Sequence, residues 1–313
     1  MGKFKKLEKY SSWRKIAMGI WNGPGDPTIY GFEEFRMDDI LEFFDEIQAA
    51  TTTTIKPMHA AVHACAQTMT ENPDLNVAII NGRCMKRPSV DIFCQVAVPG
   101  KTASEGDLSG VKLRNVDGMD IVEIARALRG RARKVRAGTD EEIERQKSTI
   151  DRIPRLLMRN AMRAMEFLTW NVPVDLKKAG LPDDPFGSAM VSSLATYGMQ
   201  NGFAPLIPSS RTPILLVPGA IYDAVMPHNG EPKVCKAMQL TLTCDHRAFD
   251  GLQLSYLSNI VQATYNDFQS VFPTADALAK HHPDGEEAGL AALAAHRAAR
   301  DGAARDGASA AAE

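Results

Sequence analysis

Apolar and polar residues follow two different rhythms along the chain, one helical and one extended. Residues 37–48, MDDILEFFDEIQ, place apolar side chains at helical spacing between acidic ones, which predicts an amphipathic helix. Residues 28–35, TIYGFEEF, are rich in strand-forming residues and directly precede it. Residues 57–69 are mostly small and predict a second helix, ending at the turn-forming sequence ENPDLN. This part of the chain therefore predicts a strand followed by two helices.

Two more strands and a long helix are predicted next. The strands are VAIINGRC at 77–84 and VDIFCQVAV at 90–98, separated by a polar turn that contains proline. Residues 119–148 are helical in composition, although Gly130 and Gly138 weaken the helix. The run RGRARKVR within them is typical of a solvated helix face.

Residues 150–170 alternate apolar residues with arginines, which predicts a helix with one apolar and one cationic side. Such a helix usually packs against the core or a partner helix, and binding to a membrane surface is the alternative. From residue 188 the pattern turns to strands, and a helix follows at about 252–268. This mixed order indicates an α/β sandwich rather than regular parallel βαβ winding.

Composition narrows the class of protein. With 313 residues, 44% of them apolar, the chain can bury a large core in one sizeable domain or two small ones. Its 36 basic and 38 acidic residues give a net charge of −2, which offers no electrostatic reason to bind nucleic acid. Five scattered cysteines, and no apolar stretch near the roughly 20 residues of a spanning helix, predict a soluble, cytoplasmic protein.

The candidate chemistry lies in LTCDHRAFDGLQL, residues 242–254, where a predicted strand ends in several charged residues. In an apolar cleft, His246 would be desolvated, neutral near physiological pH and able to act as a general base. A buried carboxylate at Asp250 would need backbone donors or an arginine partner, and would hold the histidine's loop. By itself, a single histidine at a strand end is more often structural.

Other candidate groups point to packing. His59 and His63 lie four residues apart on one predicted helix, a spacing that suits a metal, but no third ligand has sensible spacing, so we expect no metal site. Cys244 precedes Asp245, whose charge disfavours a thiolate, so we do not expect a nucleophile there.

DHRAFDG, residues 245–251, resembles the DHRxxDG signature of the acyltransferase component of 2-oxo acid dehydrogenase complexes. SAMVSSLATYG resembles the FTISNLG segment of that family, with Ala195 in place of glycine. KLEKYSSWRKIAMGIW, VKLRNVDGMDIVEIARAL and the helix that ends at Pro-Asp-Leu-Asn are similar to further family segments. The resemblance spans roughly residues 5–270 and is weakest between 139 and 187.

The resemblance implies a chloramphenicol acetyltransferase-like fold, an α/β two-layer sandwich with a mixed β-sheet flanked by helices. Residues 1–272 would form the catalytic domain, with an atypical helical insertion at about 139–187. Residues 273–313 would be an Ala-rich C-terminal extension, in part disordered.

The resemblance also implies transfer of an acyl group between thiols, commonly dihydrolipoamide and coenzyme A, the latter as substrate. His246 would be the general base and the Ser192 hydroxyl the oxyanion donor, with Ser193 a weaker candidate. Asp250 would brace the turn through an arginine, with Arg247 in the same network. No residues that bind coenzyme A are identified.

Family members form trimers, with each histidine facing a channel that the neighbouring subunit completes, so we expect a homotrimer with Asn201 near the interface. No lipoyl domain or lipoyl group is expected on this chain, so a separate lipoyl protein or a coenzyme A thioester would supply the acyl group. The atypical C-terminal end favours a free trimer over a larger cage. The main alternative is a non-catalytic trimeric scaffold, and a third is a membrane or lipid acceptor at the helix 150–170.

Overall fold

The computed structural model describes residues 26–81, 83–100, 106–151, 153–171, 184–228, 230–282 and 290–299. The segment KLEKYSSWRKIAMGIW, residues 6–21, which resembles a family segment, lies outside the described residues. No described helix is both long enough and apolar enough to cross a membrane. The expected cytoplasmic location stays a prediction.

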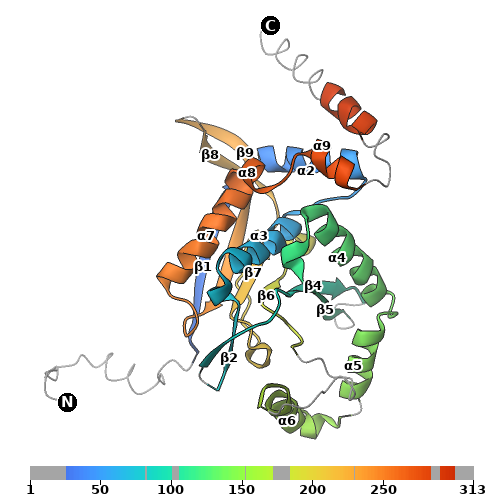
Figure 1. The fold of residues 1–313 in the computed structure, drawn as a ribbon, viewed down its shortest axis with the longest axis vertical. Helices are drawn as coiled ribbons and strands as arrows, with labels where there is room; N and C mark the ends of the chain where they lie inside the picture. The colour runs from blue at the N-terminus through green and yellow to red at the C-terminus, as the bar shows by residue number, and fades with distance from the viewer. Residues whose placement is uncertain are drawn as a thin grey trace, which may run out of the picture.

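A mixed seven-stranded sheet forms the centre of the described fold, in the order β1-β9-β7-β6-β4-β5, with β8 paired to β9 (Figure 1). The pairs β4–β6 and β6–β7 are parallel and the others are antiparallel. The strands are β1 (Thr28–Arg36), β4 (Ile92–Val98), β5 (Asp107–Leu113), β6 (Ala189–Val191), β7 (Ile214–Pro218), β8 (Tyr222–His228) and β9 (Glu231–Asp245). The predicted mixed sheet is therefore confirmed.

Helices cover one face of this sheet. Ile214 and Leu216 of β7 are buried in the large core that the helices complete, whereas Leu215 and Val217 pack on the opposite face against Leu194 and other residues of the loop after β6. This makes a sheet layer and a helix layer, with a thinner cover on the outer face. The helices are α2 (Asp38–Thr51), α3 (Pro57–Glu71), α4 (Ile121–Arg136), α7 (Gly251–Asn266), α8 (Phe268–Val271) and α9 (Ala275–His281), with short 3-10 turns η1 (Pro73–Leu75), η2 (Val116–Gly118), η5 (Ala195–Tyr197) and η6 (Pro208–Ser210).

The strand expected over 77–84 is a hairpin instead. β2 (Val77–Ile80) turns at Asn81 and pairs with β3 (Arg83–Lys86) in a separate two-stranded sheet. Asn81 has φ 51°, a left-handed conformation that asparagine tolerates and that an Asn-Gly turn requires. The Asn-Gly dipeptide was therefore the signal that separates the two strands.

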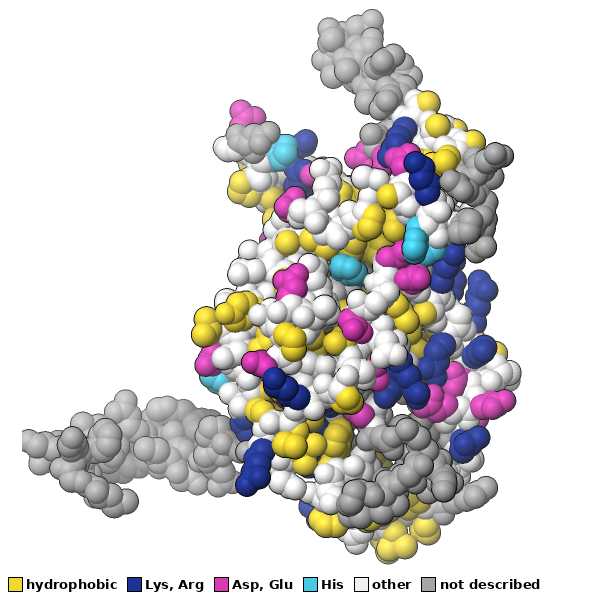
Figure 2. Space-filling model, in the orientation of Figure 1, with side chains coloured by type: hydrophobic (Ala, Val, Ile, Leu, Met, Phe, Trp, Pro, Cys, Tyr) yellow, Lys and Arg dark blue, Asp and Glu magenta, His cyan; other side chains and the backbone are white. Residues whose placement is uncertain are grey.

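The helix expected over 119–148 is two helices, α4 and α5 (Glu141–Asp151), because Gly138 ends the first one with φ 65°. The basic run in α4 is partly neutralised, since Arg131 forms ion pairs with both Asp140 and Glu142. Figure 2 shows basic and acidic side chains intermixed on the flank formed by α4 and α5. This flank is a solvated face of mixed charge, as the sequence indicates.

The helix expected over 150–170 begins later, as the turn η3 (Arg155–Leu157) followed by α6 (Met158–Asn171). No residue of α6 is buried, and Phe167 is 59% exposed, so its apolar side does not pack into the core of this chain. Polar contacts attach the helix: the Trp170 indole donates to the Ser209 carbonyl at 3.0 Å, and Glu166 pairs with Arg211. A partner helix and a membrane surface both remain as interpretations of its apolar side.

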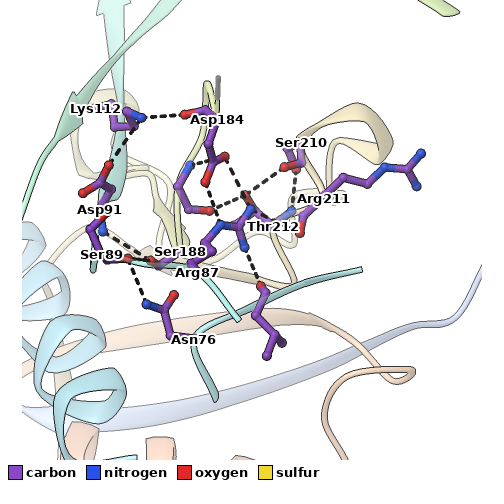
Figure 3. A network of polar contacts seen from close by, with 12 residues as sticks. Asn76, Arg87, Ser89, Asp91, Lys112, Asp184, Ser188, Ser210, Arg211 and Thr212 are labelled. Carbon is purple, nitrogen blue, oxygen red and sulfur yellow. Dashed lines mark hydrogen bonds and ion pairs between the residues drawn. The ribbon is translucent and has the colours of Figure 1, made fainter. Parts of the chain in front are cut away.

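A polar network holds together the starts of β4 and β6 (Figure 3). Arg87 donates to the Asp184 carboxylate at 2.7 Å, and Lys112 pairs with Asp91 at 3.3 Å. Gly187 has φ 70°, and a Cβ there would lie 2.4 Å from the Asp91 carbonyl oxygen, so the crossing of the two segments requires glycine. The network fixes the strand that leads to Ser192.

The described part of the C-terminal extension, residues 290–299, is helical. Leu293 is 1% exposed, and Arg297 forms ion pairs with Glu46 of α2 and Asp276 of α9. This helix is therefore anchored to the fold by the apolar side chains of Leu290 and Leu293 and by two ion pairs. The expected disorder farther along lies outside the described residues.

Candidate active site

The DHRAFDG segment lies at the end of β9, the strand that pairs with both β1 and β7. Asp245 is the last residue of β9, and the backbone amide of Asp245 donates to the Pro213 carbonyl at 2.9 Å. Phe249, 1% exposed, inserts into the core just after the turn, and its amide donates to the Asp245 carbonyl at 3.1 Å. The segment is therefore fixed to the sheet at one end and to the core at the other.

Asp245 and Arg247 form an ion pair within the turn. The Asp245 carboxylate accepts from the Arg247 amide and Nε at 3.0 Å each and from Nη2 at 2.6 Å. Burial, the largest single effect, raises the pKa of Asp245, but the hydrogen bonds and charge of Arg247 outweigh it, and the pKa lies below its usual range. The carboxylate thus stays ionised and closes the turn.

Asp250 holds the turn through backbone donors, and no arginine among the described residues pairs with it, so the expected arginine brace stays a prediction. Its carboxylate caps the N-terminus of α7, accepting from the amides of Leu252 at 2.8 Å and Gln253 at 3.4 Å. The Gln253 side chain accepts from the Asp250 amide in return, which completes a capping box. The arginine of the turn, Arg247, binds Asp245 instead. Asp250 braces the turn through a helix end, because a carboxylate before a helix satisfies amides that have no helical partner.

A backbone hydrogen bond holds His246 in place, while the residue is exposed to solvent. Its amide donates to the Pro27 carbonyl at 2.9 Å, just before β1 begins. The residue is exposed in the single chain. The apolar cleft expected around this histidine is therefore absent from the described part of one chain, and any desolvation must come from other groups.

Ser192 follows β6 directly. Its amide donates to the Leu216 carbonyl at 3.0 Å, which extends the pairing with β7 by one residue. The residue is half-buried, and its hydroxyl has no hydrogen-bond partner within the described parts of the chain. The neighbouring Ser193 hydroxyl accepts from the Ala195 amide at 3.3 Å, so it already has a local role.

The strand register keeps Ser192 and His246 apart. Residues that pair across neighbouring strands form rows: Val191 pairs with Leu216, which pairs with Leu242. Ser192, the residue after Val191, therefore lies in the next row, which contains Thr241. His246 lies five residues farther along β9 (246 − 241) and two strands away. At about 3.4 Å per residue and about 4.8 Å between strands, the two residues are on the order of 20 Å apart. One chain does not bring them together.

Two other candidate groups have structural explanations. The His59 ring accepts from the Lys56 amide at 3.1 Å as part of the α3 capping box, and burial lowers its pKa to about 4. It is therefore a neutral cap rather than half of a metal pair with His63. Burial, followed by the charge of Asp245, raises the pKa of Cys244 to about 12, so its thiol stays protonated.

Sequence comparison identifies the family. A model of the "2-oxoacid dehydrogenases acyltransferase (catalytic domain)" family matches residues 22–151 and 178–272. The chain belongs to this family. It is an acyltransferase catalytic domain, as its motif indicates. A search of curated proteins finds no match.

Solved structures share the fold at low sequence identity. The chain is similar to a probable dihydrolipoamide acetyltransferase from Listeria monocytogenes (TM-score 0.54, 16% identity, 85% of this chain and 96% of that one). It is also similar to the cubic core of a pyruvate dehydrogenase multienzyme complex (TM-score 0.57, 16% identity, 86% and 96%). A third is the dihydrolipoamide acetyltransferase of Azotobacter vinelandii (TM-score 0.57, 16% identity, 86% and 96%), studied for the roles of a serine, a histidine and an asparagine in its catalytic mechanism. The matches show the acyltransferase fold.

The family match omits residues 152–177 and everything after 272. The omitted internal stretch contains α6 and falls within the predicted insertion. The boundaries of the insertion and of the C-terminal extension stay predictions.

Proposed function

We propose that this chain is a coenzyme A-dependent acyltransferase that moves an acyl group between thiol carriers, with His246 as general base and Ser192 as oxyanion donor. The turn after β9 carries this proposal, because its other charged groups are committed: Asp245 to Arg247, and Asp250 to the start of α7. His246 is exposed on a fixed backbone, and its ring forms no ion pair or hydrogen bond among the described residues. Such a group suits proton transfer to and from a substrate.

The relative from Azotobacter vinelandii supports the assignment. The histidine and asparagine studied in its mechanism are separated by the same four residues as His246 and Asp250 here (250 − 246). An aspartate at this position caps α7 through its carboxylate, a role that asparagine also fills. We therefore assign Asp250 to positioning the histidine and not to the reacting atoms.

The reaction would proceed as follows. The His246 imidazole removes the proton of the incoming thiol, and the thiolate sulfur bonds to the carbonyl carbon of the acyl thioester. The carbonyl oxygen becomes an oxyanion, to which the Ser192 hydroxyl donates. The old carbon–sulfur bond then breaks, and the leaving thiolate takes the proton back from the imidazolium. The acyl group changes carriers and the enzyme is unchanged.

Assembly would bring the two residues together. Because Ser192 and His246 lie on the order of 20 Å apart in one chain, the site requires His246 of one copy and Ser192 of another. Tyr30 and Phe32 on β1 are 54% and 62% exposed, and Tyr30 contacts the ring of Phe203 edge-on at 5.5 Å. Phe32 lies in the row of Thr241, which Ser192 continues. Tyr30 lies two rows nearer to His246, in the row of Thr243, and both aromatic residues would pack against a second copy. A homotrimer is the assembly that we propose.

The acceptor in this proposal is a dithiol such as dihydrolipoamide. The acyl donor would be acyl-coenzyme A; in the reverse direction, the acylated dithiol would be the donor and coenzyme A the acceptor. Assays with acyl groups of different chain length would show which one is transferred.

A direct assay tests the proposal. The purified chain would be sized by light scattering and given acetyl- or longer acyl-coenzyme A with free dihydrolipoamide, while released coenzyme A thiol is measured against an enzyme-free control. We expect turnover that follows the trimer population on dilution. A folded trimer with no turnover on any acyl chain would overturn the proposal and favour the non-catalytic scaffold.

A further inference from the structure

A histidine pair meets a carboxylate at the end of α9, on the side of the fold where α9 lies above the start of α4 (Figure 1). His282 Nε2 lies 2.8 Å from Asp120 Oδ2. His281 belongs to the same cluster, in which one ligand atom from each of the three residues lies within 4.8 Å of the others. Residues 162 positions apart thus converge on one point.

The local backbone orients the Asp120 carboxylate and the two histidine rings. Asp120 is the N-cap of α4, and its Oδ1 accepts from the amides of Val122 and Glu123 at 2.9 Å each. This leaves Oδ2 facing away from the helix, in a fixed direction. His282 leaves the helical conformation with φ −114° and ψ 78°, which allows two consecutive histidine rings to approach one carboxylate.

A third histidine lies nearby on α3. His63 Nδ1 is buried and has no hydrogen-bond partner within the described residues. Its ring packs 4.9 Å from Phe272, which precedes α9. Burial lowers the pKa of His63, and the negative charge of Asp120 opposes this effect. His63 therefore lies within electrostatic range of Asp120, and its Nδ1 has no described partner, but it is not a member of the three-residue cluster.

We propose that Asp120, His281 and His282 bind a Zn²⁺ ion, which ties the end of α9 to the start of α4. Two imidazole nitrogens and one carboxylate oxygen are a common zinc donor set, whereas Ca²⁺ and Mg²⁺ prefer oxygen ligands throughout. Zinc bonds of about 2.0–2.2 Å place tetrahedral ligands roughly 3.3 Å apart. To bind zinc, the Asp120 and His282 atoms, now 2.8 Å apart, would separate by about 0.5 Å, and ligand atoms up to 4.8 Å apart would approach by about 1.5 Å, which rotation of the His281 ring can provide.

The fourth position would be filled by water, as in other zinc sites with three protein ligands. The hydrogen bonds to Asp120 Oδ1 act as the outer support that metal-binding carboxylates usually have. The competing explanation is a plain hydrogen bond between His282 and Asp120 without any metal. The site uses none of the residues proposed for acyl transfer.

Zinc binding by the full-length chain without a histidine tag tests the proposal. After treatment with a chelator and its removal, calorimetric titration with Zn²⁺ should give one ion per chain and a higher thermal midpoint. His281→Ala should weaken binding about 100-fold or more and abolish the thermal shift, since one ligand is lost. His281 is exposed, so this change leaves the core intact.

Two more variants complete the design. Asp120→Asn keeps a cap acceptor for α4 but loses the charge, and should also weaken Zn²⁺ binding. His228→Ala, on β8, removes a histidine outside the cluster and should bind as the natural chain does. The proposal is overturned if the natural chain binds no stoichiometric Zn²⁺, or if the His281→Ala variant binds Zn²⁺ as tightly as the natural chain. Either result would leave a plain hydrogen bond between His282 and Asp120 as the explanation of the cluster.

Discussion

The two halves of the candidate site are built in different ways. At the His246 end, an ion pair, a helix cap and a bond to Pro27 fix the turn, and the histidine is exposed. At the Ser192 end, a three-residue strand pairs with β7 and the serine is half-buried. The histidine half is rigid but open to solvent, and the serine half is sheltered but lacks a base. In the proposed mechanism neither half carries out acyl transfer by itself, and the register keeps the two halves apart in one chain.

The largest effect is expected at the rigid half. His246→Ala should lower kcat by about 10²–10⁴, because general base catalysis is lost while the backbone bonds of the turn remain. Steady-state kinetics at equal oligomeric state would measure it, with His228→Ala as the matched control. Unchanged kcat in a folded variant would remove the base from the proposal.

The serine half should give a smaller effect. Ser192→Ala should lower kcat by about 10²–10³, the usual loss for one oxyanion donor, with little change in KM. Ser193→Ala is its control and should stay within a few-fold of the natural chain, because that hydroxyl already accepts from Ala195. Reversed results for the two serines would transfer the oxyanion role to Ser193.

A pH effect is expected from α3, outside both halves. The pKa of buried His59 is lowered from 6.5 to about 4, so the unfolded chain binds this proton more readily. The free energy of unfolding should therefore fall as pH drops from about 6.5 to about 4, by up to about 3 kcal/mol from this group. His59→Gln keeps an acceptor for Lys56 and should flatten the fall, as measured by urea unfolding across pH. An equally steep fall in the variant would contradict this assignment.

The smallest effect distinguishes a helix cap from an arginine brace at Asp250. Asp250→Ala should lower the free energy of unfolding by about 1 kcal/mol, and Asp250→Asn should change it by only a few tenths, because asparagine caps nearly as well. Urea denaturation of both variants provides the comparison. Equal losses would show that the charge of Asp250 matters and would restore the ionic role.

Local signals account for what the sequence predicts well. The periodicity of residues 37–48 and the small residues of 57–69 predict α2 and α3 to within a few residues, since each pattern lies within one element. The Asn-Gly turn at Asn81 and the break at Gly138 were also readable, and they define the hairpin and the two helices.

Long-range placement could not be predicted in this way. Whether an arginine braces Asp250 depends on contacts between separate segments, which sequence order does not decide; among the described residues, Arg247 binds Asp245. The meeting of Asp120 with His281 and His282 joins segments that no spacing rule connects. The separation of Ser192 from His246 follows from strand register, which the family motif does not contain.

Co-assembly of two inactive variants tests the central claim, that the site forms between copies. His246→Ala and Ser192→Ala chains would be unfolded together, refolded in equal amounts and assayed beside each variant alone. If His246 of one copy acts with Ser192 of the next, about one quarter of the sites (1/2 × 1/2) regain both residues, and activity should rise to about that share of the natural enzyme. Mixed oligomers as inactive as the separate variants would contradict the account.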